Sequence, residues 1–362
     1  MIRRGRGGAS HDVVGARRGA ATVSVVIPCF DYADYLSDAV TSVLSQVGVS
    51  VEVIVVDDAS TDGSLAIARR WAATDRRVSV VAHHHNRGPV DTFNDGLRVA
   101  SGEYLVRLDA DDMLTPGSLH RAVALARAHP EVGLVYGHPL HVADEHLPAP
   151  RISPTGWTIW SGREWLADRC RDGLNVITSP EVLMRKSVVD RVGGQMPLAH
   201  THDMEMWFRI AAFADVAYIR GVDQAWHRDH PRSLSSREVD PLRDLYERRD
   251  AFDVLFSGPA GQIPAAAELH RTAVRAVAEY GIAMATGCYD RREVDHDLVN
   301  GYVAFVRDAV EDPTSLDGWR TLSRRMRRGR GSATHPLYVG RRLARKVRTD
   351  ASWRRWHRGG TF

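Results

Sequence analysis

Three aspartates, Asp109, Asp111 and Asp112, follow a short apolar run and lie close enough together in the chain to repel one another. Such a cluster needs a positive partner. Arg107 is nearby, but if Leu105, Arg107 and Asp109 alternate on one side of a strand, a single arginine cannot balance three acids. Carboxylate oxygens suit Mg²⁺ or Mn²⁺, hard cations that proteins usually share with substrate phosphates. The cluster therefore predicts a metal-bound phosphate compound.

A structural role for these acids stays open at this point. Asp-rich strand ends are often turns or helix N-caps, and Asp112 could serve that purpose before the segment MLTPGSL. A second acidic strand end, Asp57-Asp58, weakens this alternative. Asp58 could cap the next helix, although three neighbouring polar residues compete for that position. Two acidic loops that face one crevice favour a functional site.

The segments that must position these loops alternate between two patterns. Short, β-branched apolar runs alternate with stretches of helical apolar spacing, which is typical of a mostly parallel, Rossmann-like α/β sheet with helices on both faces. Ligands collect at the carboxyl ends of such strands, so the loops that begin at Pro28, Asp57, His83 and Asp109 should border one crevice. The predicted strands are 23–28, 51–58, 78–83, 103–109, 181–186 and 215–220, and the predicted helices include 34–46, 60–72, 90–100, 203–213 and 270–285.

The composition divides the chain into four parts. Residues 1–21 form a flexible basic arm, 22–235 the α/β body, 236–320 a helical extension and 321–362 a basic Arg-rich tail that is only partly ordered. Residues 321–362 hold thirteen Arg or Lys and one acid, although the whole chain has a formal charge of only +3. An acidic body therefore carries basic ends.

Length, hydropathy and cysteine content limit the class of protein. The chain has 362 residues, of which 44% are apolar, enough for about two packed domains. Because neither a run of about 18 apolar residues nor the apolar core of a signal peptide is present, a cytoplasmic protein is expected. Cys29, Cys170 and Cys288 lie far apart and read as reduced, mostly buried thiols.

Four segments, in this order and spacing, resemble the inverting family 2 glycosyltransferases of GT-A fold: 23–46, 51–64, 86–112 and 202–211. The resemblance covers roughly residues 23–235. It implies an enzyme of the hexosyltransferase type that moves a sugar from a nucleotide-diphospho-sugar, UDP-linked, to an acceptor hydroxyl. The acceptor would be a sugar or a lipid-linked molecule, in cell-surface polysaccharide or glycolipid synthesis.

The resemblance also implies roles for residues of the nucleotide site. Pro28 and Phe30 match the segment that contacts the nucleotide, with Phe30 packing on the base. Asp58 matches the acid that accepts a hydrogen bond from the uracil imide, which would explain a carboxylate without a basic neighbour. Asp111 matches the ligand of Mn²⁺ or Mg²⁺, and Asp109 assists through the ribose or a metal-bound water. A buried core position remains the alternative for Phe30.

The base expected to take the proton from the acceptor is Asp203, at the start of the predicted helix 203–213. Glu205 is the rival, and because it would point to a different side of the helix, both cannot face the sugar. An N-cap role is the alternative for Asp203. His202 stands where the family commonly has Glu, a departure that could shift the pKa of the base.

Two further positions concern the diphosphate. Arg228 and His230, in the segment WHRDHP, match basic positions of the family that hold the diphosphate or complete the metal shell, with a solvated surface pair as the alternative. Phe93 stands where the family often carries an arginine that can reach phosphate. Arg87 is the candidate substitute.

Other enzyme classes fit less well. A nicotinamide dehydrogenase needs GxGxxG after the first strand, a haloacid-type phosphatase needs its nucleophilic Asp there, and a sugar nucleotidyltransferase needs a Gly-rich basic loop there. None of these is present. The remaining alternative is a catalytically inactive accessory protein that binds nucleotide-sugar or membrane. The intact Asp58, Asp109, Asp111 and Asp203 argue against it.

The basic tail raises a separate hypothesis. Its arginines alternate with apolar and aromatic residues, as in interfacial membrane segments, which predicts peripheral attachment to an anionic membrane, at the inner face of the plasma membrane. Nucleic acid is not an expected partner, because the acidic body would repel a polyanion and no nucleic-acid-reading motif is present. A solvated tail is the alternative. The residues concerned are Leu337, Val339, Leu343, Val347, Trp353 and Trp356.

Overall fold

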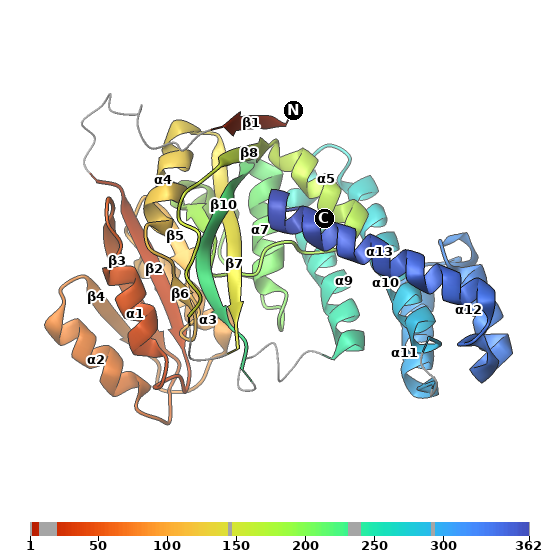
Figure 1. Ribbon diagram of the computed structural model, residues 1–362. Helices are drawn as coiled ribbons and strands as arrows, with labels where there is room; N and C mark the ends of the chain where they lie inside the picture. Colours follow the sequence, from red (N-terminus) through yellow and green to blue (C-terminus); the bar gives the residue numbers. More distant parts are fainter. Residues whose placement is uncertain (1, 7–19, 144–146, 231–239, 291–293, 362) are drawn as a thin grey trace.

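A ten-stranded sheet with helices on both faces forms the body of the protein (Figure 1). The computed structural model describes residues 2–6, 20–143, 147–230, 240–290 and 294–361. The strand order is β1-β8-β10-β7-β9-β5-β2-β3-β4, with β6 paired to β10. This arrangement confirms the predicted α/β fold class.

The half of the sheet that is formed by residues 22–107 is parallel, as predicted. Its two central strands are continuous β-branched runs that are almost fully buried, whereas its edge strand is partly exposed. Each connection passes through a helix, as parallel pairing requires. The elements are β2 (Thr22–Cys29), α1 (Leu36–Leu44), β3 (Ser50–Asp57), α2 (Ser64–Thr74), β4 (Val78–Ala82), α3 (Pro89–Val99) and β5 (Tyr104–Arg107).

The other half of the sheet is mixed, so the sheet as a whole is less parallel than the sequence predicts. The long strands β7 (Val132–Val142) and β10 (Asp215–Arg228) run parallel to each other. The remaining pairs, which involve short strands, are antiparallel. These short strands are β1 (Arg3–Arg6), β6 (Met113–Leu114), β8 (Gly156–Trp160) and β9 (Leu183–Arg185).

The N-terminal residues differ from the predicted flexible arm where the structure describes them. β1 pairs antiparallel with β8 at the edge of the sheet. The guanidinium of Arg3 contacts the carboxylates of Glu131 (2.6 Å) and Asp215 (3.0 Å), so the basic end is fastened to the acidic body. Residues 7–19, the rest of the predicted arm, lie outside the described residues.

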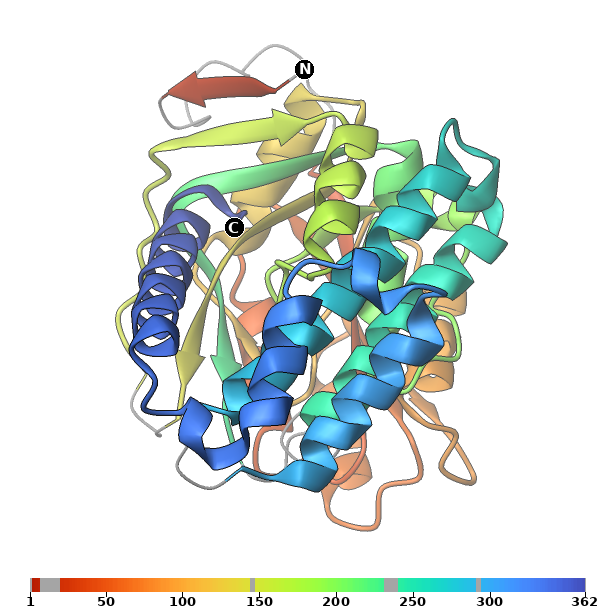
Figure 2. The same ribbon diagram turned by 90° about the vertical axis from the view of Figure 1, so that its right-hand side faces the viewer.

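Helices cover the two faces of the sheet with separate apolar cores. α1, α2 and α4 (Ser118–Ala128) pack on one face, and α3, α5 (Gly162–Asp172) and α7 (His202–Phe213) pack on the other. The short helix α6 (Lys186–Val192) precedes α7. The predicted helical extension lies against α5 and α7 and shares their core (Figure 2). Its helices are α9 (Pro241–Ser257), α10 (Ala266–Cys288) and α11 (His296–Ala309).

The basic tail is helical and turns back onto the sheet, in contrast to the partly ordered tail that the composition predicts. It consists of α12 (Trp319–Arg328) and α13 (Pro336–Gly359), and α13 reaches β10 near the C-terminus (Figure 1). The buried Trp356 donates a hydrogen bond from Nε1 to the carbonyl of Val176 (2.8 Å). In the described part of the chain, none of the helices has the length and apolarity needed to span a membrane.

Candidate active site

The loop after β2 leaves Phe30 exposed at the carboxyl end of the strand. Its side chain is 42% exposed, so it is not the buried core residue of the alternative reading. The next residue, Asp31, has a left-handed backbone (φ +58°), which Asp tolerates better than most residues. Its carboxylate accepts a hydrogen bond from the backbone N–H of Thr61 (2.7 Å), which ties the β2 loop to the β3 loop.

Asp58 is buried and accepts three hydrogen bonds, which corrects the expectation that it lacks a basic neighbour. The donors are Nδ1 of His83 (2.7 Å) and the backbone N–H groups of Arg87 (2.8 Å) and Gly88 (2.9 Å). Nε2 of His83 contacts Asp95 on α3 (2.9 Å), so this imidazole lies between two carboxylates. A carboxylate has about four acceptor sites, which leaves Asp58 room for one further donor.

The guanidinium of Arg87 points toward α3. It contacts the carboxylates of Asp95 (2.5 Å) and Asp91 (3.3 Å), so the geometry does not support the predicted reach toward a phosphate. Phe93 is fully buried, and the guanidinium carbon of Arg107 lies 5.9 Å from its ring centroid. Arg107 thus supplies a guanidinium beside the position where the related enzymes often carry an arginine.

Each acid of the aspartate cluster has its own basic partner within the protein. Arg107 is therefore not the sole basic neighbour of the three acids, because His227 and His230, at and just after the end of β10, lie against Asp112 and Asp111. The three contacts are Arg107 Nη2–Asp109 (2.9 Å), His230 Nε2–Asp111 (2.9 Å) and His227 Nδ1–Asp112 (3.0 Å).

Asp112 joins two elements rather than capping a helix. It is fully buried and accepts hydrogen bonds from His227 Nδ1 and from the backbone N–H of Arg228 (2.9 Å). The N-cap of α4 is Gly117 instead. Burial favours neutral His227, but the charge and hydrogen bond of Asp112 outweigh this effect and raise the pKa of His227 to about 10. Asp112 therefore anchors the segment that carries His230.

Asp111 and His230 are suited to bind one divalent cation together. Oδ2 of Asp111 and Nε2 of His230 face each other at 2.9 Å, close to the separation of neighbouring ligands on one ion. Burial, followed by the charges of Asp112 and Asp109, raises the pKa of Asp111 to about 7, so the pocket favours added positive charge. Carboxylate oxygens with one imidazole nitrogen fit Mn²⁺ and also Mg²⁺.

Two aromatic residues that the sequence analysis did not single out hold this imidazole. The rings of Tyr35 and Tyr32 lie 5.0 and 6.1 Å from the ring of His230, centroid to centroid. Arg228 lies over Tyr35 and also contacts Asp38 on α1 (2.7 Å). Their signal in the sequence is the cluster of aromatic residues directly after the first strand of the sheet.

Of the two candidate bases, Asp203 faces the cluster and Glu205 does not. Asp203 lies in the first turn of α7, whose N-cap is Thr201, and the charges of Arg107 and Asp109 both act on it. Burial raises the pKa of Asp203 to about 6, although Arg107 lowers it. Glu205 is 1% exposed and contacts the guanidinium of Arg209 instead.

His202 is neutral in this arrangement. Its Nε2 lies 2.7 Å from Nη1 of Arg107, and because arginine can only donate, this nitrogen accepts. Nδ1 then donates to the carbonyl of Leu198 (3.3 Å). Burial, with the charge of Arg107, lowers the pKa of His202 to about 3. Because His202 carries no charge, the positive charge of Arg107 acts mainly on the carboxylates of Asp109 and Asp203.

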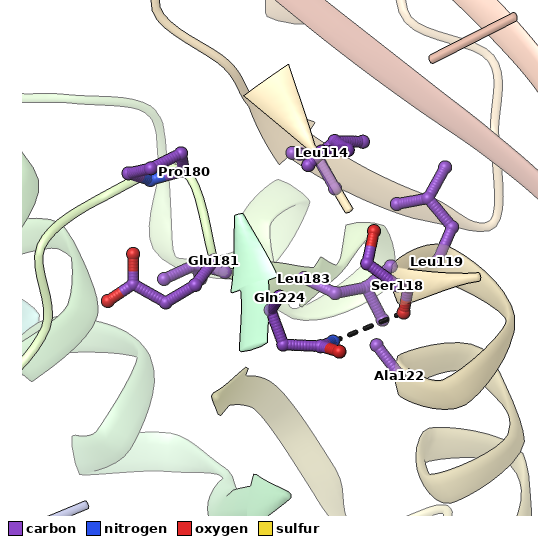
Figure 3. Close-up of a pocket in the computed structure, with 10 residues that line it drawn as sticks. Leu114, Ser118, Leu119, Ala122, Pro180, Glu181, Leu183 and Gln224 are labelled. Atoms are coloured by element: carbon purple, nitrogen blue, oxygen red, sulfur yellow. Dashed lines mark hydrogen bonds between the residues drawn. The ribbon is translucent and has the colours of Figure 1, made fainter. Parts of the chain in front are cut away.

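A small internal cavity near the site is not a sugar pocket. It has a volume of about 10 Å³ and lies among β6, α4, β9 and β10 (Figure 3). Gln224 donates from Nε2 to the carbonyl of Ser118 (3.1 Å) across its edge. This volume suits about one water molecule.

Comparison with known proteins identifies the domain. Residues 24–193 match the family model described as Glycosyl transferase family 2. The chain carries a family 2 glycosyltransferase domain. The succinoglycan biosynthesis protein ExoO of Rhizobium meliloti is 40% identical over 106 residues, which are 29% of this chain and 30% of that protein. The chain spans about a third of the length of the curated relatives it matches.

Solved structures share the fold of this glycosyltransferase domain and its extension. S. aureus TarS 1–349 in complex with UDP-GlcNAc has a TM-score of 0.60 at 17% identity, covering 85% of this chain and 92% of that one. A mannosyltransferase from Pyrobaculum calidifontis, in complex with GDP-Man and Mn²⁺, has a TM-score of 0.51 at 20% identity, covering 84% and 87%. At these identities the likeness shows the GT-A fold alone.

The matched segment of the glycosyltransferase domain contains only part of the candidate site. Asp58, Asp109 and Asp111 lie within residues 24–193, whereas Asp203 and His230 lie beyond it. Folding brings these two residues back to the cluster, because α7 and the end of β10 both adjoin the carboxyl end of the parallel strands. The complete site therefore requires the chain as far as the end of β10.

Proposed function

We propose that the protein is a metal-dependent, inverting glycosyltransferase that moves a sugar from a UDP-sugar to an acceptor hydroxyl. The observation that carries this proposal is the facing pair of Asp111 and His230, 2.9 Å apart, in a cluster that also includes the carboxylate of Asp203. The complexes of solved neighbours with UDP-GlcNAc and GDP-Man support a nucleotide-sugar donor, and the succinoglycan biosynthesis protein ExoO supports a role in polysaccharide synthesis. The remaining acceptor site on Asp58 would suit the imide N–H of uracil.

Each end of the donor has a proposed partner. The ring of Phe30, displayed after Pro28, would pack on the base, and Asp58 would accept from the imide N–H. Asp109, Asp111 and His230 would hold Mn²⁺ or Mg²⁺. An ion held there would supply positive charge that stabilises the departing nucleoside diphosphate.

Asp203 would perform the proton transfer. An acceptor hydroxyl that attacks the anomeric carbon must lose its proton, and a carboxylate in hydrogen-bond reach can take it. With a pKa of about 6, Asp203 is mostly ionised at pH 7 yet more basic than an exposed aspartate. Arg107 lies close enough to keep the ionised form available.

Donor hydrolysis tests the proposal without knowledge of the acceptor. Purified full-length protein is incubated with a panel of UDP-, GDP- and other nucleotide-sugars in the presence of Mn²⁺ or Mg²⁺, and the released nucleoside diphosphate is measured. We expect release from a UDP-sugar that stops when EDTA is added. Absence of both hydrolysis and nucleotide binding across the panel would overturn the proposal.

The acceptor would be a lipid-linked sugar, which α13 would bring near by binding an anionic membrane surface. Leu343, Val347 and Trp353 are exposed apolar residues on this helix, and basic residues such as Lys346 and Arg354 are exposed beside them. Apolar side chains mixed with Arg and Lys favour the interface of an anionic bilayer.

A further inference from the structure

A second group of metal-binding side chains lies at the ends of β7 and β10. His141 and His227 occupy paired positions on these two parallel strands, so their side chains lie side by side (Figure 1 shows the two strands). Asp229 follows His227 by two residues and therefore points to the same face. Its backbone N–H continues the pairing by donating to the carbonyl of Val142 (2.9 Å).

The ligand atoms of these three residues converge. Oδ1 of Asp229 lies 3.4 Å from Nδ1 of His141 and 3.8 Å from Nε2 of His227. One ligand atom from each residue can be chosen so that all three lie within 4.8 Å of one another. Tetrahedral Zn²⁺, with bonds of about 2.0–2.1 Å, needs ligand atoms roughly 3.3 Å apart. Small side-chain rotations would bring these three atoms into three of the four tetrahedral coordination positions.

The orientation of His227 supports a metal site independently of this clustering. Its Nδ1 donates to the buried carboxylate of Asp112 at 3.0 Å, so Nε2 points outward to His141 and Asp229. A bound metal ion would displace the proton that Nε2 carries in the metal-free protein. Histidines that bind metal in proteins usually make this contact with a carboxylate, which fixes the ring and increases the basicity of the metal-binding nitrogen. His141 and Asp229 are about half exposed, which leaves coordination positions open to water or another ligand.

We propose that His141, His227 and Asp229 form a second divalent-metal site of the zinc class, distinct from the pair Asp111 and His230. The ion would fasten β7 to the end of β10. Since the segment 227–230 also carries Arg228 and His230, an ion at this site would restrain the residues proposed to face the donor.

Cobalt binding tests the site with a readout other than activity. Tag-free, full-length Asp111→Asn is titrated with Co²⁺ alone, and binding is followed by visible absorption and calorimetry. We expect one bound Co²⁺, with affinity reduced about tenfold or more by adding either His141→Ala or Asp229→Asn. His120→Ala, at another exposed histidine on α4, is the matched control and should change nothing.

The single variant His141→Ala, made in the otherwise unaltered protein, guards against misfolding of the double variants. In this single variant the number of bound Co²⁺ ions should fall by one. Zn²⁺ should still raise the Tm of Asp111→Asn through the second site, and adding His141→Ala to that variant should abolish this rise. Circular dichroism verifies that each variant is folded. Unchanged stoichiometry and affinity in His141→Ala and Asp229→Asn, or no Co²⁺ bound by folded Asp111→Asn, would refute the second site.

Discussion

Glu205 and Arg209 form a bidentate ion pair one turn apart on α7, with Nε–Oε1 and Nη2–Oε2 distances of 2.8 Å each. Arg209 also donates to the carbonyls of Val192, Gly193 and Gly194, so the pair fastens the turn after α6 to α7. Both carboxylate oxygens of Glu205 are thus engaged in the interior. This relationship separates the two acids that the sequence alone leaves as rival bases.

We expect Glu205→Gln to act on stability. The substitution leaves the buried charge of Arg209 without its anion, which should lower the free energy of unfolding by about 3–5 kcal/mol. Urea denaturation monitored by circular dichroism measures this change. A variant of undiminished stability that has lost turnover would show instead that Glu205 acts in the reaction.

Asp203→Asn is expected to act on turnover. The amide cannot accept the proton of the acceptor, so turnover should fall by on the order of a hundredfold or more, with UDP binding nearly unchanged. Turnover is measured with the donor identified in the hydrolysis panel and its acceptor. Near wild-type turnover in this variant would exclude Asp203 as the base.

The segments predicted correctly are those whose chemistry is local. The β-branched runs of β2 and β3 are buried on both faces and could form only inner strands, and the carboxylates after β3 and β5 follow from this placement. Asp203 stands out in the sequence because its position at the start of α7 matches a family motif, and its role as the base stays a prediction. In these places a few consecutive residues contain enough information.

The contacts that the sequence did not predict join distant segments. Asp112 pairs with His227 across 115 residues, because β6 and the end of β10 are neighbours in the sheet. The approach of His230 to Asp111 is suggested only by the family resemblance and not by any local pattern. The four residues of β1 carry three arginines and no alternation, so their pairing with β8 leaves no local signal. Likewise, the sequence around an aromatic residue such as Trp356 does not show whether its side chain packs on the body or inserts into a membrane.

The pKa of Asp203 predicts the pH dependence of the reaction. The base must be ionised, and burial raises its pKa to about 6, so kcat at saturating donor and Mn²⁺ should decline as the pH falls through about 6. His202→Glu would place a negative charge beside Arg107 and weaken its effect on Asp203. The acid limb should therefore move to higher pH.

His202→Gln is the matched control for this shift, because its amide oxygen can accept from Arg107 without adding charge. Its acid limb should stay near that of the unaltered protein. The two pH–rate profiles are recorded under identical conditions. If the acid limb of His202→Glu lies at the same pH as in the unaltered protein, or at a lower pH, the arrangement of Arg107 between residues 202 and 203 would be contradicted.

Asp111→Asn should abolish metal-dependent nucleotide binding. The substitution removes the charge that faces His230 and that would hold the cation against the diphosphate. Calorimetric titration of UDP with and without Mn²⁺ measures the effect. Asp297→Asn, an exposed acid on α11, is the control for loss of one charge and should bind as the unaltered protein does. Equal Mn²⁺ enhancement of UDP binding in Asp111→Asn would remove the metal assignment.

The membrane prediction must be tested on the exposed face of α13. Deletion of residues 321–362 would also remove the buried Trp356, which donates a hydrogen bond to Val176 of the body, so loss of binding could reflect unfolding. Leu343, Val347 and Trp353 are 60%, 68% and 50% exposed, and their replacement should not disturb the fold. The comparison is therefore between the unaltered protein and a triple variant that combines Leu343→Ser, Val347→Ser and Trp353→Ala.

Sedimentation with vesicles containing phosphatidylserine gives the measurement. We expect the unaltered protein to pellet at low salt and to be released at high salt, because attraction between Arg or Lys and anionic lipid is screened by ions. The triple variant should stay largely in the supernatant, since the basic residues alone lose the apolar contribution to interfacial binding. Equal sedimentation of both proteins would assign the attraction to charge without insertion, and recovery of both in the supernatant at low salt would show that α13 is an ordinary solvated helix.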